Sequence, residues 1–427
     1  MIVEFTIENF WSFKERRTFS LLATKDNELS ESNTIESSKK LRFLKSAVLY
    51  GANASGKSNF FRALVFFLNF SVFSGPNKQV GDTIETTPFA LSKQTISAPS
   101  FFELVFIIMD GTEETRYRYG FAVDNKQVIT EHLFAVHKVK EVMLFSRDFQ
   151  EINHTSYFKE GIRGKPFVRS NSSFLSICAQ GNGKISTEII RYFRNVRVSS
   201  GLNEQALSSQ RRTSQINYKE KILGFLKYAD IQITDYKTEH VPAFSKPLES
   251  DLLTFLKNKF PSFQKEQILE ERVSYGHIVH DGEIPVGELY LDETQESDGT
   301  RKLFSYSSDI LEVLEKGTSL FIDEFDTKLH PLLIERIVKL FNSPITNQKN
   351  AQLIISCHAV NIMTNKLFRR DQIWFCEKDE YGATDLYSLV EYKEPVRKDT
   401  LFNKNYLQGK YGAVPYLSEF FPKFGSE

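Results

Sequence analysis

Apolar and polar residues alternate at the start of the chain, and longer apolar runs follow. Residues 3–8 alternate strictly, and this period of two predicts a strand with one buried face. The apolar run Ser46–Tyr50 ends at Gly51, and a helical pattern covers Asn59–Phe70. We therefore expect a buried strand, a glycine turn and a helix in that order.

Three β-rich runs occupy most of residues 101–149. They cover Phe101–Met109, Thr115–Val123 and Val128–Val136, and turn-forming residues such as Asp110-Gly111 separate them. Runs of this kind with short polar breaks are typical of hairpins. We predict an antiparallel meander for this part of the chain.

Strand and helix patterns alternate at both ends of the chain, around a more polar stretch at 151–270 that is mostly helical in pattern. Beyond it we expect strands at Val273–Val279, Leu289–Leu291, Ser319–Ile322, Gln352–Ser356, Ile373–Phe375 and Asp385–Val390, and helices at about Thr300–Glu315 and Pro331–Phe341. This order predicts an α/β fold with one mostly parallel sheet built from both chain ends. The expected division is 1–150, an inserted helical lobe at 151–270, and 271–427.

The composition excludes some classes of protein. The 427 residues are 41% hydrophobic and 25% charged, and Lys plus Arg equal Asp plus Glu at 54 each. With no net charge, any nucleic acid would have to bind a local basic patch or another subunit. The three cysteines are scattered, the N-terminus does not resemble a signal peptide, and no apolar run approaches the ~20 residues that cross a bilayer. We expect a cytoplasmic protein without disulfides or membrane contact.

The most specific motif is a glycine-rich loop that matches G-x-x-x-x-G-K-[ST] in full. Its residues are Gly51, Ala52, Asn53, Ala54, Ser55, Gly56, Lys57 and Ser58, with Asn59 next in the helix. Main-chain N–H groups of such a loop and the helix N-terminus bind phosphates. Lys57 would reach the β- and γ-phosphates of ATP, and Ser58 would ligate Mg²⁺. A chance glycine-rich turn is the minor alternative.

Two adjacent acids end the strand expected at Ser319–Ile322. Successive side chains of a strand point to opposite sides, so one acid can bind in the coordination shell of Mg²⁺ while the other orients or deprotonates a water molecule. We expect Asp323 to be the metal-side acid and Glu324 the general base. A solvated Asp-Glu turn is the alternative, and the phosphate loop makes it the minority interpretation.

His358 follows the next apolar strand, where it could donate to γ-phosphate oxygens. Alone, it would be taken as a structural histidine, but its place on the strand after Glu324 favours the catalytic role. His277 and His280 have no third ligand nearby, so a zinc site is not expected.

The turn Ser297-Asp298-Gly299-Thr300 opens the helix before the carboxylate strand. A serine at a helix N-terminus can form an anion site. The same residue types are equally favoured as an ordinary N-cap, so spacing alone does not separate the two interpretations.

These motifs together resemble the head of an ABC-type ATPase of the SMC and OLD kind. More narrowly, five segments are similar to the bacterial abortive-infection and Rlo-type AAA family: Ile7–Phe13, Tyr50–Gly56, Glu296–Thr300, Asp323–Pro331 and Tyr406–Pro415. The resemblance covers about residues 1–140 and 285–420. It implies a P-loop ABC-type head with a mixed β-sheet, a β-meander subdomain and an inserted helical lobe.

The resemblance also implies roles and partners. Ser297–Thr300 would be the signature loop, Asp326 the D-loop acid and His358 the switch histidine. Two heads would sandwich ATP, so a homodimer or higher homo-oligomer is expected. Members are typically encoded beside an effector, which implies an ATP-hydrolysing sensor or regulator in anti-phage defence that controls an effector, a nuclease or toxin, in trans.

The sequence departs from the wider pattern in three respects. The signature lacks the Ser-Gly-Gly form of transporter ATPases. No glutamine is assigned to the Q-loop, for which neither Gln79 nor Gln94 is a compelling candidate, and the chain after His358 is too short for an OLD-type nuclease domain. We therefore expect nuclease activity, if present, to be in another chain.

An SMC-like ATPase that clamps DNA in repair or maintenance is an alternative function, and a scaffold locked by ATP is a third. The basic pairs Lys39-Lys40, Arg211-Arg212 and Arg369-Arg370 are candidate DNA contacts, although isolated basic pairs are usually solvated surface.

Overall fold

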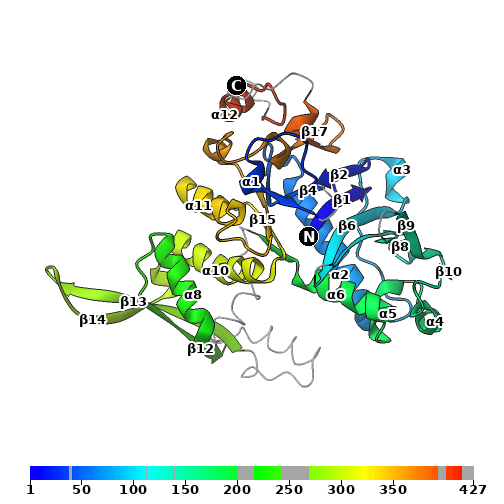
Figure 1. The fold of residues 1–427 in the computed structure, drawn as a ribbon, viewed down its shortest axis with the longest axis horizontal. Coiled ribbons are helices and arrows are strands. Elements are labelled where there is room, and N and C mark those ends of the chain that lie inside the picture. Colours follow the sequence, from blue (N-terminus) through cyan, green and yellow to red (C-terminus); the bar gives the residue numbers. More distant parts are fainter. Residues whose placement is uncertain are drawn as a thin grey trace, which may run out of the picture. The chain divides into compact units, whose positions relative to one another are not determined.

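The computed structural model describes residues 1–37, 41–111, 113–137, 140–200, 216–242, 269–392 and 401–415. The chain forms two compact units, one of residues 1–202 with 313–427 and the other of residues 203–312. Figure 1 shows both units as ribbons and labels many of their helices and strands.

A six-stranded sheet in the first unit carries the predicted motifs at its strand ends. Its order is β11 (Arg197–Ser200), β15 (Ser319–Asp323), β16 (Gln352–Ser356), β5 (Ser46–Tyr50), β17 (Ile373–Lys378) and β18 (Thr384–Ser388). Neighbouring strands are parallel except for the antiparallel pair β17–β18. Strands from both chain ends thus form one mostly parallel sheet, as predicted, but its edge strand β11 comes from the stretch expected to form the inserted lobe. Every residue of β5, β15 and β16 is buried, as their continuous apolar runs require.

The second sheet of this unit is a seven-stranded antiparallel meander. Its order is β10 (Glu151–His154), β9 (Lys140–Asp148), β8 (Val128–His137), β7 (Glu113–Val123), β6 (Ser100–Asp110), β1 (Ile2–Glu8) and β2 (Arg17–Ser20). The three strands predicted at 101–136 are β6, β7 and β8. The meander continues into β9 and β10, so it extends past residue 150 and includes the N-terminal strand.

Helix α2 (Lys57–Asn77) packs within the main hydrophobic core, which draws residues from both sheets. Phe60 and Phe67 are fully buried and make ring contacts with Phe5 of β1 at centroid distances of 5.9 and 5.7 Å. On another face, Phe61 contacts Phe321 of β15 at 6.4 Å. The phenylalanine-rich sequence of α2 therefore anchors the phosphate-loop helix between the two sheets.

Shorter elements complete the first unit. They are helices α1 (Ser30–Asn33), α3 (Lys93–Ile96), α4 (Gly161–Gly164), α5 (Phe174–Gln180), α6 (Lys184–Asn195), α11 (Pro331–Asn342) and α12 (Phe402–Leu407), and strands β3 (Thr34–Glu36) and β4 (Arg42–Leu44). Among the described residues, no helix is long and apolar enough to cross a membrane.

The second unit is a small three-stranded antiparallel sheet with helices. It contains α8 (Ile216–Tyr228), β12 (Asp235–Pro242), β13 (Leu269–Asp281), β14 (Ile284–Asp292) and most of α10 (Asp298–Lys316). Tyr236 and Tyr275 pack edge-on against Phe304 at 5.0 and 5.1 Å, which joins the sheet to α10.

The predicted lobe at 151–270 corresponds to no single body in the structure. Helices α4, α5 and α6 group with the first unit, whereas α8 and β12 belong to the second. Strand β12 pairs with β13 some thirty residues further along the chain, and local patterning does not reveal such a pairing. The division at 150 and 270 remains a prediction.

We predict that Phe67→Ala lowers the free energy of unfolding by roughly 3–5 kcal/mol, because it leaves a cavity in a close-packed aromatic cluster. The matched control is Phe73→Ala on the same helix, whose side chain is 44% exposed and whose loss should be about 1 kcal/mol or less. Urea denaturation followed by tryptophan fluorescence measures both changes. Equal losses would contradict the central packing of α2.

Candidate phosphate-binding site

The glycine-rich loop joins β5 to α2, as its motif requires. Gly56 has a φ of 109° and Ala54 a φ of 62°, and both values lie in the left-handed region that favours glycine. A Cβ on Gly56 would lie 2.1 Å from Oγ1 of Thr384, and one on Gly51 would lie 2.3 Å from the carbonyl oxygen of Cys376. Both motif glycines are therefore needed because β17 and β18 press against the loop.

Hydrogen bonds that involve the hydroxyl groups of Ser12 and Thr384 hold the loop in position. Thr384 Oγ1 lies 2.9 Å from the carbonyl oxygen of Ser55 and 2.7 Å from Ser12 Oγ. The Asn59 side-chain amide donates to Ser12 Oγ at 2.7 Å. Asn59, expected to contact the cofactor, thus helps to position the loop. Ser12 lies in the family-like segment Ile7–Phe13, but no sequence pattern indicated its contact with the loop or any role for Thr384.

Lys57 lies inside the loop with which it is expected to bind phosphate. Its ammonium donates to the carbonyl oxygens of Gly51 and Ala52 at 2.8 and 3.0 Å. Burial lowers the pKa of Lys57, whereas the charges of the neighbouring Asp323, Glu324 and Asp326 act to raise it. The Lys57 ammonium is therefore held in the loop by main-chain carbonyl oxygens and lies beside three acidic side chains.

The two acids predicted at the end of β15 are tied to the next strand by Ser356. Its hydroxyl donates to Asp323 Oδ1 at 2.6 Å and accepts from the main-chain N–H of Glu324 at 2.7 Å. Glu324 itself has a φ of 50°, a left-handed conformation that is costly for a residue with a Cβ. A serine at the tip of β16 thus fixes the turn that carries both carboxylates.

His358 lies beyond the same strand tip. Its main-chain N–H donates to Asp326 Oδ2 at 2.8 Å, which links the histidine to the acid assigned to the D-loop. Burial and the charge of Lys57 lower the pKa of His358, against the opposing charges of Asp326, Glu324 and Asp323. We therefore expect a neutral imidazole near pH 7, able to donate one hydrogen bond.

The structure brings these predicted residues together at one edge of the parallel sheet. Strands β5, β15 and β16 run parallel, so the loop and the tips with Asp323 and His358 share their carboxyl ends. The carboxylates of Asp323 and Glu324 are close enough for their charges to act on the pKa of Lys57 and of His358. Ligand sites in open α/β sheets form at this edge.

The residues expected to hold ATP and Mg²⁺ fit those ligands. Among the described contacts, Ser58 Oγ and Asp323 Oδ2 take part in no hydrogen bond, so a hydroxyl and a carboxylate oxygen remain for a magnesium ion, which prefers oxygen ligands. The hydroxyl of Ser55 is buried without a partner in the described structure, and a phosphate oxygen would satisfy it.

The turn Ser297–Thr300 lies in the second unit. Ser297 Oγ accepts from the main-chain N–H of Thr300 at 3.1 Å, and Asp298 forms an ion pair with Arg301. The N-cap interpretation is therefore satisfied within the chain itself. The signature role of Ser297, Asp298, Gly299 and Thr300 remains a prediction.

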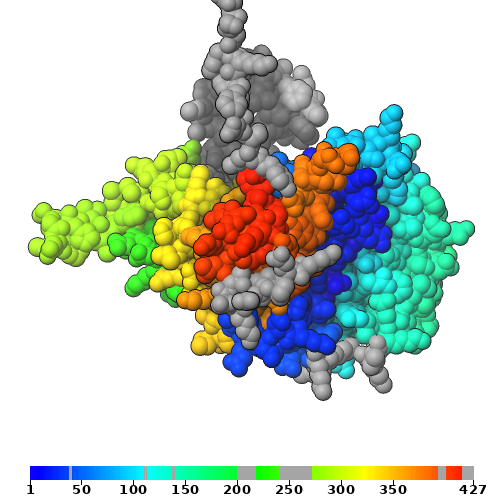
Figure 2. Space-filling view, turned by 90° about the horizontal axis from the view of Figure 1, so that it is seen from above, coloured from blue at the N-terminus to red at the C-terminus, as the bar shows by residue number. Residues whose placement is uncertain are grey.

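A pocket of about 640 Å³ opens in front of the loop. Its lining includes Gly51–Ser55 and His358, and the remaining residues come from the C-terminal part of the chain: Cys376–Lys378, Tyr406 and Ala413–Pro415. Figure 2 shows the red segment after residue 401 at the surface, beside the orange β17–β18 region. Tyr406–Pro415 was noted only as a family motif, and nothing in the local sequence indicated that it faces the phosphate loop.

The basic pairs considered for DNA differ from the expected solvated surface where they are described. Arg369 is 2% exposed and pairs with Asp371 at 2.7 Å, while Arg370 pairs with Asp26 at 2.6 Å. These arginines tie the chain to its N-terminal part. Lys39-Lys40 and Arg211-Arg212 lie outside the described residues.

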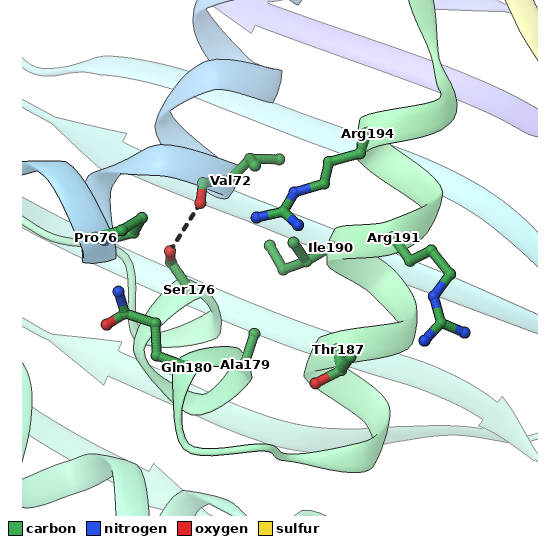
Figure 3. Close-up of a pocket in the computed structure, with 9 residues that line it drawn as sticks. All are labelled: Val72, Pro76, Ser176, Ala179, Gln180, Thr187, Ile190, Arg191 and Arg194. Carbon is green, nitrogen blue, oxygen red and sulfur yellow. Dashed lines mark hydrogen bonds between the residues drawn. The ribbon is translucent and has the colours of Figure 1, made fainter.

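A second, smaller pocket of about 300 Å³ lies near the C-terminal end of α2, between α5 and α6. Figure 3 shows Arg194 extending toward Val72, above Ile190, whereas Arg191 points away from α2. Val72 and Pro76 of α2 line this pocket and lie 15 and 19 residues beyond Lys57, so at 1.5 Å per residue roughly 25 Å separate it from the phosphate loop. None of the predicted site residues lines it.

The sequence model of a protein family described as "AAA domain, putative AbiEii toxin, Type IV TA system" matches residues 46–364. This span covers about three quarters of the 427 residues and contains the phosphate loop, the two acids and His358. The chain belongs to this family. AAA domains are P-loop ATPase domains, so membership implies nucleotide binding, usually with Mg²⁺, in a toxin–antitoxin or abortive-infection context. No curated protein is similar enough to this chain to stand as a relative.

We predict that Gly56→Ala abolishes nucleotide binding, because its Cβ would meet Thr384 in a backbone conformation that alanine resists. Gly81→Ala is the matched control: Gly81 has a φ of 93° with no atom within 4 Å of the added Cβ. The control should lose about 1 kcal/mol of stability and keep its affinity. Calorimetric titration with ADP and thermal melting measure the two effects. Normal ADP affinity in Gly56→Ala would contradict the predicted clash.

Proposed function

We propose that this protein is an ATP hydrolase whose nucleotide cycle regulates a partner protein in bacterial anti-phage defence. The observation that carries the proposal is the meeting of Lys57, Asp323, Glu324 and His358 at one sheet edge, supported by the family match over residues 46–364. In this proposal the predicted site residues keep the roles assigned from the sequence.

The chemistry follows from the positions of these groups. The loop amides and Lys57 bind the β- and γ-phosphates, Ser58 and Asp323 hold Mg²⁺, and the ion would neutralise charge on the phosphate oxygens. Glu324 accepts a proton from the attacking water while the bond between the γ-phosphorus and the bridging oxygen breaks, which releases ADP and phosphate. Neutral His358 donates a hydrogen bond to a γ-phosphate oxygen, where negative charge must be stabilised.

The regulatory part of the proposal requires two states. ATP bound by one chain is closed over by Ser297–Thr300 of a second copy, and hydrolysis opens that contact, so a partner that prefers one state can respond to it. The toxin–antitoxin context of the family supports a protein effector acting in trans.

Lys57→Ala should raise the dissociation constant for ATP roughly tenfold or more, because a buried charge-assisted contact is lost. Lys339→Ala, on an exposed part of α11, is the control and should bind normally. Titration calorimetry with a non-hydrolysable ATP analogue gives both constants. Unchanged affinity in Lys57→Ala would refute the phosphate-binding role.

Glu324→Gln should lower kcat for phosphate release roughly a hundredfold or more, because the amide cannot accept the proton of water. Nucleotide affinity should stay near that of the wild type, and the variant should accumulate as an ATP-bound dimer. Phosphate release and the mass in solution with and without ATP measure these outcomes. Near-normal turnover would remove Glu324 as the base, and a monomer at every nucleotide concentration would refute the sandwich.

A further inference from the structure

The pocket in front of the phosphate loop is lined on one side by residues that lie outside the glycine-rich motif. One side is the loop itself with His358, and the other is formed by the end of β17 and the segment after α12. We call the lining residues Lys378 and Ala413–Pro415 the C-terminal wall. They lie outside the span that the family model matches.

The C-terminal wall is held in place by specific contacts. Tyr406 donates its hydroxyl to the carbonyl oxygen of Ala413 at 3.0 Å, and Tyr387 donates to that of Tyr411 at 2.7 Å. The Tyr406 ring stacks on Phe375 of β17 at 5.5 Å, with an angle of 19° between the planes. A segment bound in this way to the strand next to β5 keeps a fixed position relative to the loop.

The wall presents groups that bind anions. The side chain of Lys378 is exposed and has no hydrogen bond or ion pair with any described residue. The main-chain N–H groups of Ala413 and Val414 also have no acceptor within the described part of the chain. Gly412 and Ala413 have φ values of 70° and 57°, and successive N–H groups in such turns form anion-binding concavities.

The other charged residue on this side is Glu377, whose carboxylate contacts the wall itself. The Glu377 Oε2 atom lies 3.0 Å from the Tyr387 hydroxyl oxygen and close to Gly412, where an added Cβ would be 2.6 Å from it. Its carboxylate is therefore engaged within the wall. Lys378 provides the positive charge at the mouth of the pocket.

We infer that the C-terminal wall binds the outer phosphates of a nucleoside triphosphate and thereby selects triphosphate over diphosphate. This inference rests on the proposed function, because it assumes that the phosphate loop holds the nucleotide. The pocket also contains His358, whose proposed partner is the γ-phosphate, so a contact from the opposite side reaches the phosphate that ADP lacks. The chain thus provides in cis a nucleotide sensor that is separate from the loop.

Lys378→Gln tests the inference in the full-length protein. The dissociation constant for a non-hydrolysable ATP analogue should rise roughly three- to tenfold, the range expected for a charge-assisted contact at a partly open site, with a smaller effect on ADP. Lys404→Gln is the matched control, since this exposed lysine on α12 does not line the pocket. Val414→Asp, which puts a carboxylate in the wall, should weaken the analogue further, and Leu407→Asp controls for the added charge.

The outcomes separate this inference from the proposed function. If the wild type binds the analogue and Lys57→Ala does not, unchanged affinity in both folded wall variants overturns the inference alone. Equal losses for ADP and the analogue also overturn it, because selection for the outer phosphate would be absent. If Lys57→Ala binds as well as the wild type, the proposed function itself fails. Thermal melting of each variant identifies any loss that comes from unfolding.

Discussion

Parallel pairing of β15, β16 and β5 is the constraint on which the candidate site depends. The three strands are far apart in the sequence, yet their register aligns Ile322 with Ile355 and Ser356 with Leu49. Side chains that follow these strands must therefore emerge at the same edge. The hydrogen bond from Ser356 to Asp323 joins the ends of β16 and β15 directly. The order of the strands in the sheet therefore determines which side chains meet in the site.

The aromatic packing of α2 supports this edge from within. The helix is buried on several sides, against β1, β7, α6 and β15, and its first residues are part of the phosphate loop. A helix fixed by large rings on several faces allows little movement of Lys57 or Ser58. The loop can thus remain ordered although Ala54 and Gly56 have positive φ values.

Much of the first unit could be predicted because its signals are local. Continuous apolar runs identified β5, β15 and β16, and the glycine motif required a strand before it and a helix after it. Ser12, Thr384 and Ser356 could not be assigned, because their importance comes from contacts with residues up to several hundred positions away. The same applies to Tyr406–Pro415, whose place beside the loop depends on packing against β17.

The second unit was harder to predict for the same physical reason. Strand β12 forms by pairing with β13 across an intervening stretch of chain, so its polar sequence gives a weak strand signal and its surroundings favoured a helical interpretation. Arg369 illustrates the opposite error: two adjacent arginines suggest an exposed surface, yet one is buried by its pairing with Asp371.

The left-handed backbone conformation of Glu324 favours one amino acid for stability and another for the proposed reaction. A residue with a Cβ loses about 1 kcal/mol in this conformation, and glycine would remove that strain, but glycine has no carboxylate to offer a water molecule. With Glu324 in its proposed role as general base, selection for a more stable chain and selection for turnover would favour different amino acids at this position. Homologues that have lost the reaction and kept the fold should be free to carry glycine or asparagine there.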